Sequence, residues 1–503
     1  MALFAAIDIG SNSVRMKIAR LVRHRLVVAQ EDREVTRLGK AVFKTGLLAP
    51  DCMAHTVEVL RRFHKTVQKH GAHMVRVVGT SALRDARNAQ PFLDWVHSAT
   101  GWKVEIVTGL EEARLIHLGL VANSRFGDTP LLMADLGGGS CELTISVGGH
   151  IRYTTSLPLG AVRLTEEFLK HDPPKRDELE RLSRYVEKEL GRVSRRVIAF
   201  NPRSVIATSG TAAALAVVCA GKGRQTAAVA RADVARIAKK LARMKISQRT
   251  SLQGVGPRRA EIIVAGAQVF ARVLERCHVR SFRYSPLGLR DGLLAQMVAD
   301  YDRRTRSRRQ IESDRSDALL NLGKNYQVDW KYSKQVRALA LNLFRRLRPI
   351  HALPPNYEEW ISAAAMLHEA GIYLNRYGWH RHTYYIIAHS EVFGYTQYER
   401  LLIAAIARYL GSSRPSSRDK AMRVLLPRDR PLVSKAVLLL RLARALNQGR
   451  SGAVKGLAVQ VKGEKVRLRI ARKSRADLEL WSLEKEAGYF RELFGRELEA
   501  ALS

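Results

Sequence analysis

The sequence is poor in cysteine and contains no long apolar run. Its four cysteines, Cys52, Cys141, Cys219 and Cys277, are widely separated and form no Cys-x-x-Cys pair. We therefore expect neither a disulfide framework nor a thiolate metal site. A reducing, cytoplasmic setting is expected for such a protein. No apolar stretch approaches the roughly 20 residues of a membrane-spanning helix, so no membrane partner is expected. The apolar segment 1–10 has no basic leader, which favours a buried strand over a signal peptide.

Acidic residues are scarce relative to basic ones. The 503 residues include 47 Asp and Glu against 85 Lys and Arg, a formal net charge of +38. Such an excess predicts attraction to polyanions, namely nucleic acid, acidic membranes or long phosphate chains. A general arginine bias of the proteome is an alternative explanation of the same net charge. Aromatic residues make up 7%, do not cluster with the arginine runs and belong to no recognised nucleic-acid-binding motif, so we expect no nucleic-acid partner.

An internal repeat is present in the first 300 residues. Residues 4–19 combine an apolar run, the turn Asp-Ile-Gly-Ser-Asn-Ser and a second apolar run, and residues 131–146 repeat this order around Asp-Leu-Gly-Gly-Gly-Ser. A third strand-like stretch follows each copy, at 25–30 and 150–156. Both copies then continue into alternating helical and strand patterns. The repeat predicts two tandem α/β lobes with a cleft between them.

The periodicity predicts individual elements within the lobes. In the first copy it indicates helices at 52–70, 89–99 and 111–121 and strands at 74–78 and 103–107. In the second copy it indicates helices at 175–199 and 231–242, and a strand at 205–208 that ends in a turn at 209–211. We predict lobe 1 at 1–125 and lobe 2 at 126–302.

The character of the sequence changes near residue 302. Five arginines lie within residues 303–309, which is typical of a linker or a solvated helix face. Residues 313–410 are predicted to be almost wholly helical, with a break at 412–417, a helix at 435–446, a hairpin at 454–470 and a terminal helix at 483–502. We therefore predict an all-α domain at 303–425 and a small α+β domain at 426–503.

The two repeated turns have the residue types of a phosphate clamp. Glycine lets the backbone approach a phosphate closely with its N–H groups, and hydroxyl and amide side chains add donors. The predicted phosphate contacts are Ser11, Asn12 and Ser13 in the first turn and Gly137, Gly138, Gly139 and Ser140 in the second. Asp8 and Asp135 end the preceding strands, where carboxylates can hold Mg²⁺ directly or through water.

These segments resemble the two phosphate motifs of the exopolyphosphatase/guanosine pentaphosphate phosphohydrolase (Ppx/GppA) family. Four further segments agree with that family in order and spacing, at 79–84, 109–114, 207–211 and 286–292. The resemblance covers residues 1–300 and implies a duplicated ribonuclease H-like (actin/hexokinase-like) α/β fold. It also implies hydrolysis of terminal phosphoanhydrides in inorganic polyphosphate, guanosine pentaphosphate or both.

The resemblance also implies roles for individual residues. It places the water-activating carboxylate at Glu112, whereas Glu111 is interpreted as complementing a helix dipole. Arg84 resembles the arginine that grips phosphate. We further predict phosphate contacts at Ser209, Gly210 and Thr211, and a Mg²⁺ or other divalent site formed by Asp135, Glu142 and Asp8. For Arg290, a phosphate contact and a structural cap remain open.

The helical region resembles HD-type hydrolase domains attached to long members of the family. It contains His368-Glu369, where active HD enzymes have His-Asp, and His380, His382 and His389 follow. Arg444 occupies a position where such enzymes place an aspartate ligand, and an arginine repels a divalent cation. We therefore predict a structural or polyanion-binding role for this domain and no second active site.

Three functional classes remain in competition at this point. We favour an exopolyphosphatase, with guanosine pentaphosphate phosphatase as an alternative or second activity, because the arginines at 303–309 and 337–348 and the basic residues at 465–475 can form a path for a long chain. An actin-fold kinase or ATPase lacks an evident adenosine pocket, and a polyanion-binding protein would not need Glu112. The long helical tail favours a homodimer.

Overall fold

The structure, a computed structural model, describes residues 2–124, 126–220, 227–302 and 304–502. It divides into two compact units, Met1–Glu312 and Ser313–Ser503. The finer boundaries at residues 125, 302 and 425 remain predictions. No helix in the described ranges is long and apolar enough to cross a membrane.

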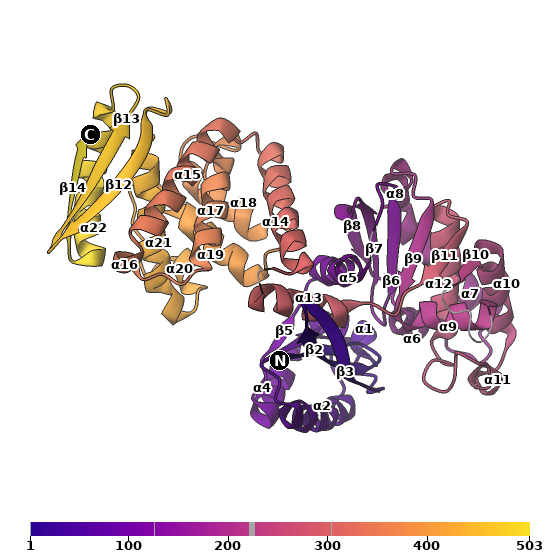
Figure 1. The fold of residues 1–503 in the computed structure, drawn as a ribbon. Helices are drawn as coiled ribbons and strands as arrows, with labels where there is room; N and C mark the ends of the chain where they lie inside the picture. The colour runs from indigo at the N-terminus through magenta and orange to yellow at the C-terminus, as the bar shows by residue number, and fades with distance from the viewer. Residues whose placement is uncertain (1, 125, 221–226, 303, 503) are drawn as a thin grey trace. The chain divides into compact units, whose positions relative to one another are not determined.

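The first sheet has five strands in the order β3-β2-β1-β4-β5 (Figure 1). Their bounds are β1 Leu3–Ile9, β2 Val14–Val22, β3 Arg25–Glu34, β4 Met74–Gly79 and β5 Val104–Ile106. The first three strands are antiparallel, whereas β4 and β5 run parallel to β1. Successive side chains of β1 alternate between two buried faces, with Ile7 and Ile9 in one core cluster and Phe4 and Ala6 in another.

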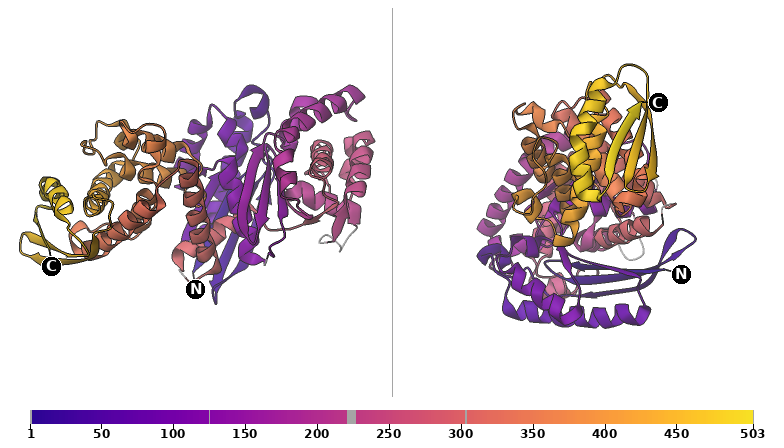
Figure 2. Two further views of the ribbon diagram at one scale, coloured as in Figure 1. Left: turned by 90° about the horizontal axis from the view of Figure 1, so that it is seen from above. Right: turned by 90° about the vertical axis from the view of Figure 1, so that its left-hand side faces the viewer.

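Helices cover one face of this sheet. They are α1 Val42–Thr45, α2 Pro50–His70, α3 Ser81–Asp85 and α4 Ala89–Thr100. The long helix α2 begins with proline in its first turn and ends at Gly71, which adopts the left-handed conformation typical of a helix end. Its apolar side chains, including Leu60 and Phe63, pack into the same core cluster as Ile7. Figure 2 shows α2 alongside the strands of the first sheet.

The second sheet has six strands in the order β10-β11-β9-β6-β7-β8. The strands are β6 Leu131–Leu136, β7 Cys141–Val147, β8 His150–Leu157, β9 Ser204–Thr208, β10 Ala228–Ala230 and β11 Ser281–Tyr284. The accompanying helices are α6 Ala161–Phe168, α7 Arg176–Gly191, α8 Ser194–Ala199, α9 Ser209–Ala220, α10 Arg231–Arg243, α11 Ile246–Thr250 and α12 Ile263–Arg276. An apolar core of α7, α9, α10 and α12 side chains covers one face of this sheet.

The two sheets share one topology. In each, three antiparallel strands are followed by two strands parallel to the first, so that β8-β7-β6-β9-β11 corresponds to β3-β2-β1-β4-β5. The first hairpin pairs Asp8 with Arg15, and the corresponding hairpin pairs Asp135 with Glu142. The unit is therefore a duplicated ribonuclease H-like core of the actin/hexokinase type, as the family resemblance implies, and its two lobes are those that the internal repeat predicts.

Two helices lie between the sheets and connect the lobes. They are α5 Gly109–Asn123 and α13 Leu289–Tyr301, and a core cluster joins their apolar residues to the inner faces of β1 and β6. The helices touch closely, because a Cβ placed on Gly292 would lie 1.8 Å from the Leu115 carbonyl oxygen. Any larger residue at Gly292 would force α5 and α13 apart, and α5 carries Glu112.

The second unit combines helices with a small sheet. The helices are α14 Arg306–Asn325, α15 Trp330–Arg346, α16 Arg348–His351, α17 Tyr357–Leu367, η1 Ala370–Tyr373, α18 Trp379–His389, α19 Gln397–Arg408, α20 Lys420–Arg423, η2 Pro427–Asp429, α21 Arg430–Ala445 and α22 Asp477–Phe494. The strands are β12 Val454–Lys462, β13 Lys465–Arg472 and β14 Glu497–Leu502. Figure 1 shows these three strands side by side next to α22, and one continuous core joins them to the helices.

The predicted terminal helix at 483–502 is wrong over its last part. Helix α22 ends at Phe494, because Gly495 adopts a left-handed conformation and its N–H bonds back to Arg491. Residues Glu497–Leu502 then pair in parallel with β13. A short alanine- and leucine-containing segment is compatible with either structure, so a tertiary partner decides its conformation.

The HD-like positions of the second unit hold no cluster suited to a cation. His368 is fully buried, and its Nδ1 donates a hydrogen bond of 2.7 Å to the Ala365 carbonyl. Burial and the neighbouring Arg444 lower the pKa of His368 to about 3. Glu369 is ion-paired with Arg450. One group within the described residues has three His, Cys, Asp or Glu side chains close enough together to hold a cation. It lies in the first unit.

The buried His368 makes the second unit sensitive to acid. Because its folded pKa is far below the unfolded value near 6.5, the unfolded chain takes up a proton first as the pH falls. We expect lowering the pH from 7 to 5 to cost about 2 kcal/mol through this residue. Urea titrations should show a smaller pH effect in His368→Asn, whereas His389→Asn, at an exposed position, should behave as wild type. Equal pH effects in wild type and His368→Asn would contradict this.

Candidate active site

The two repeated turns have the same local geometry. The Gly10 N–H donates to the Ser13 carbonyl at 3.2 Å, and the Gly137 N–H donates to the Ser140 carbonyl at 3.0 Å. The turns also approach each other across the lobes, since a Cβ on Gly138 would lie 2.9 Å from the Ser11 Cβ. A residue larger than glycine at 138 would thus collide with the turn that contains Ser11.

A cavity of about 680 Å³ opens at these turns. Eight of the eleven predicted phosphate contacts line it, together with three of the predicted acidic residues: Ser11, Asn12, Ser13, Gly137, Gly138, Ser140, Ser209, Gly210, Asp8, Glu112 and Asp135. The predicted residues are thus 11 of the 30 that line the cavity. The assignment of each residue to phosphate or metal stays a prediction.

Four predicted site residues are not among those that line the cavity. Arg84 bonds to Glu112, which lines the cavity, and Glu142 lies close to Glu112 and Asp135. Gly139 packs against Ser81 and Phe43, and Thr211 packs against Gly266 of α12. The segment 209–211 is not a free turn, because it forms the first turn of α9 directly after β9. The alanine-rich residues that follow favour helix, and Ser209 makes the sharp change of direction with a φ of 75°.

Three carboxylates form a tight group, and two of them, Glu112 and Asp135, line the cavity. One oxygen each of Glu112, Asp135 and Glu142 lies within 4.8 Å of the others. Glu112 stands in the first turn of α5, whose start is fixed by Thr108 accepting a hydrogen bond from the Glu111 N–H at 3.2 Å. Asp135 and Glu142 face each other across the β6–β7 hairpin.

Each of these carboxylates has one neutral or cationic partner. The Arg84 Nη1 donates to Glu112 at 2.9 Å and to the Val107 carbonyl at 2.8 Å. The Ser156 hydroxyl donates to Glu142 Oε1 at 2.7 Å, and the Thr208 hydroxyl donates to Asp135. Arg84 thus fixes the position of the Glu112 side chain.

Burial and mutual repulsion raise the pKa of all these carboxyls. Burial raises the pKa of Glu112 to about 7, against the lowering effect of Arg84. The pKa of Glu142 is raised well above its ordinary value by burial and by Glu112, and burial also raises the pKa of Asp8 and Asp135. Glu142 Oε2 and Asp8 Oδ1 are buried, and the described residues provide no partner for either. Oxygen ligands of this kind fit a hard divalent cation such as Mg²⁺.

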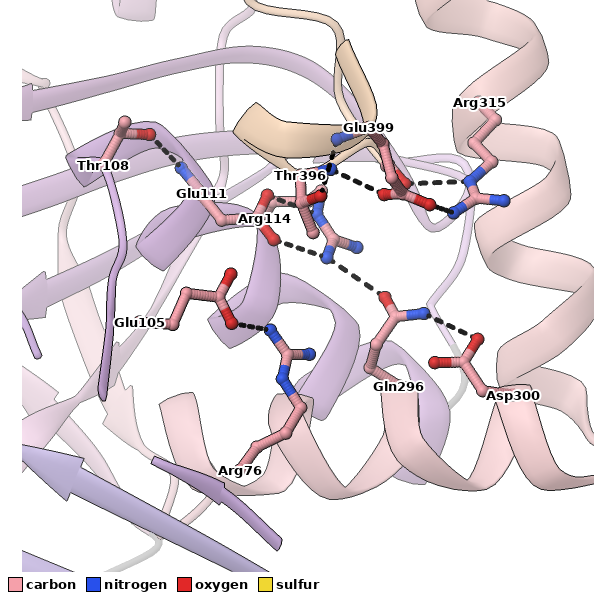
Figure 3. A network of polar contacts seen from close by, with 11 residues as sticks. Arg76, Glu105, Thr108, Glu111, Arg114, Gln296, Asp300, Arg315, Thr396 and Glu399 are labelled. Carbon is pink, nitrogen blue, oxygen red and sulfur yellow. Dashed lines mark hydrogen bonds and ion pairs between the residues drawn. The ribbon is translucent and has the colours of Figure 1, made fainter. Parts of the chain in front are cut away.

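Glu111 has a different role from its neighbour. Its two carboxylate oxygens accept hydrogen bonds of 2.8 Å from Arg114, which is 2% exposed. Arg114 also donates to Gln296 of α13 at 3.1 Å (Figure 3). The hydrogen bond from Arg114 to Gln296 ties α5 to α13. The dipole interpretation of Glu111 is therefore incomplete, because its larger effect is to neutralise a buried arginine.

Arginines form a second prominent group in the lining of the cavity. Arg15, Arg33, Arg258, Arg259 and Arg290 all line it. Burial and the other four arginines lower the pKa of Arg33 to about 9, and its Nε and Nη2 are buried without a partner in the described part of the chain. Sequence reasoning missed Arg33, Arg258 and Arg259 because they come from β3 and from the loop before α12, far from the glycine-containing turns.

Two of these arginines are positioned by close contacts. A Cβ on Gly210 would lie 1.4 Å from the Arg259 Nη2, so glycine at 210 makes room for this guanidinium. Arg290 both lines the cavity and donates to the Met16 carbonyl at 3.0 Å. The adjacent Asp291 forms a buried ion pair with Lys17 at 2.8 Å. Both alternatives for Arg290 thus agree with its position, since it faces the cavity and is anchored to β2.

Comparisons with known proteins identify the family. The model of the Ppx/GppA phosphatase family matches residues 17–301, and the model of domain III of Ppx/GppA phosphatases matches residues 315–491. A guanosine-5'-triphosphate,3'-diphosphate pyrophosphatase of Vibrio vulnificus is 26% identical over 407 residues, which cover 81% of this chain and 80% of that protein.

Solved structures agree with this result. The Aquifex aeolicus member of the Ppx/GppA family is 31% identical with a TM-score of 0.51, and the match covers 60% of this chain and 99% of that one. An exopolyphosphatase of Cytophaga hutchinsonii is 25% identical with a TM-score of 0.56, and covers 59% of this chain and 98% of its own. The chain described here therefore belongs to the Ppx/GppA phosphatase family.

Proposed function

We propose that this chain hydrolyses the terminal phosphoanhydride of inorganic polyphosphate and releases orthophosphate. The observation that carries the proposal is a cavity lined both by Glu112 and by five arginines. Tyr284 is the one aromatic residue among those that line the cavity in the described structure. A lining of this kind favours a chain of phosphates over a ligand recognised mainly through a base.

Glu112 is proposed to act as the general base. Arg84 occupies its Oε2, which leaves Oε1 to accept a proton from a water molecule. The water oxygen forms a bond to the terminal phosphorus, and the bond from that phosphorus to the bridging oxygen breaks. The bridging oxygen and its electron pair remain with the shortened chain, whose charge the arginines stabilise.

The three predicted metal ligands are proposed to hold the cation, and two of them, Asp135 and Glu142, belong to the tight carboxylate group. Asp8, Asp135 and Glu142 would bind Mg²⁺ or a similar ion, which supplies positive charge to the phosphate oxygens. Ser11, Asn12, Ser13 and the N–H groups of Gly137 and Gly138 would orient the terminal phosphate toward Glu112. Ser209 Oγ is buried without a partner in the described part of the chain and can donate to the same phosphate.

The predicted basic path in the second unit receives weaker support. Arg345 pairs with Glu358, and Lys465 and Arg467 both pair with Glu499, so part of this charge is neutralised. Arg303 lies outside the described residues. The preference for polyphosphate therefore rests on the cavity itself, and the predicted homodimer is a separate question.

A second candidate is the 5'-phosphohydrolysis of guanosine pentaphosphate. It is favoured by the Vibrio vulnificus relative, whose match extends over 81% of this chain, and by Tyr284, whose ring can stack on a base. The same Glu112 chemistry would serve both substrates, so a dual activity needs no second site.

Phosphate release from the two substrates distinguishes these proposals. We expect release from long polyphosphate to be faster than from guanosine pentaphosphate at equal concentrations of terminal phosphate, and both to stop when EDTA removes divalent cations. Faster release from guanosine pentaphosphate would favour the second candidate. If phosphate release continues in EDTA and does not become faster when Mg²⁺ is added back, the proposed cation site is contradicted.

A further inference from the structure

A segment of the second unit gathers aromatic and basic residues without any acid. Residues 370–390 contain no Asp or Glu. Within them, Tyr373, Tyr377 and Tyr385 are large exposed side chains, and Tyr377 is 91% exposed. We call the exposed side chains of residues 373–389 the α18 surface. This segment lies outside the arginine runs, and most of its basic residues are histidines.

The exposed face of α18 alternates cationic and aromatic side chains. Arg381, Tyr385 and His389 are exposed and are spaced four residues apart, so they lie along one side of the helix. The rings of Tyr385 and His389 are 4.4 Å apart. Tyr377 comes four residues before Arg381, just outside the helix. Arg381, Tyr385 and His389 thus form a row along α18, and the exposed Tyr377 precedes the helix in the chain.

The N-terminal end of α18 is electrostatically unfavourable without an anion. Its N-cap is Gly378, which offers no side chain to the free N–H groups, and the first turn contains His380, Arg381 and His382. A helix N-terminus carries partial positive charge and normally attracts acids. Here the cationic Arg381 stands where acids are usual, so a bound phosphate would relieve its repulsion with the helix dipole.

Neighbouring helices add positive charge at the same place. Burial lowers the pKa of His380, and the surrounding Arg408, Arg381, Arg444 and His382 lower it further. Arg444 stacks over the Trp379 ring at 5.2 Å and donates to the Leu410 carbonyl at 2.6 Å. Arg408 Nη1 and Arg444 Nε are buried and have no partner among the described residues.

We propose that the α18 surface binds single-stranded nucleic acid. The backbone phosphates would lie at the N-terminus of α18 beside Arg381, and bases would stack on Tyr377 and Tyr385. Exposed aromatic rings next to a cationic groove are the recurring means of holding single strands without sequence preference. Inorganic polyphosphate offers nothing to stack on tyrosine, and a second copy of this basic surface would repel the first.

Fluorescence anisotropy with the full-length chain tests this proposal. The probe is a fluorescein-labelled 20-nucleotide single strand of mixed sequence, titrated at fixed ionic strength. We expect Tyr377→Ala/Tyr385→Ala to raise the Kd about tenfold or more, and Tyr377→Phe/Tyr385→Phe to bind as wild type. Arg381→Ala should weaken binding and reduce its salt dependence. Trp481→Ala, which removes an exposed aromatic of α22, is the matched control.

Unlabelled polyphosphate added as a competitor separates stacking from charge. Its affinity should be unchanged in the double alanine variant and reduced in Arg381→Ala. Wild-type binding of the oligonucleotide by the double alanine variant would overturn the proposal. An equal loss of affinity for polyphosphate would also overturn it, because the surface would then be a general anion-binding patch. Sedimentation showing that the double alanine variant dissociates a dimer would overturn it too, because the surface would then be a subunit interface. All variants should keep the wild-type Tm, since the substituted side chains are exposed.

Discussion

Glu112→Gln should lower kcat about a thousandfold while leaving KM nearly unchanged. Glutamine keeps the shape of the side chain and still accepts the Arg84 hydrogen bond, but it cannot take a proton from water. The variant should also fold at least as well at pH 8. Because burial raises the pKa of Glu112 to about 7, its ionised form is disfavoured in the folded protein, and a neutral side chain removes that cost.

The matched control for this variant is Glu105→Gln. Glu105 lies on β5 and pairs with Arg76 at 2.6 Å, outside the residues that line the cavity. It should keep wild-type kcat. In the wild type, kcat/KM should fall as the pH falls through the pKa of Glu112, since the base is then protonated. A Glu112→Gln enzyme with more than a tenth of wild-type activity would remove Glu112 from the mechanism.

Arg33→Met should raise KM for polyphosphate about ten- to hundredfold and should raise the Tm of the free enzyme. The loss of binding follows from removing charge-assisted hydrogen bonds to phosphate. The gain in stability follows from removing a buried positive charge that is repelled by its neighbours. Burial and four neighbouring arginines lower the pKa of Arg33 to about 9, so its positive charge is held in the fold at a cost that phosphate relieves.

Arg25→Met provides the control on the same strand. Arg25 is exposed at the start of β3 and does not line the cavity, so neither KM nor Tm should change. Kinetics and thermal unfolding of both variants, with and without phosphate, distinguish a substrate contact from a structural arginine. A lower Tm with unchanged KM in Arg33→Met would show that Arg33 supports the fold and does not contact substrate.

The sequence predicts those parts of the fold and site that depend on local patterns. The repeat at Asp8 and Asp135 indicates both lobes, since strand, turn and strand recur in register. Glu112 follows from the family motif. The arginines at 33, 258 and 259 could not be predicted, because only the tertiary fold brings β3 and the loop before α12 to the turns. The same limit applies to residues 497–502, whose strand conformation depends on pairing with β13.

The most direct test of the central claim is hydrolysis of polyphosphate in water enriched in oxygen-18. If water activated by Glu112 attacks the terminal phosphorus, each released orthophosphate should carry one solvent oxygen and the shortened chain none. Mass spectrometry of both products after a single turnover gives the answer. Solvent oxygen in the shortened chain, or orthophosphate released without it, would contradict the account.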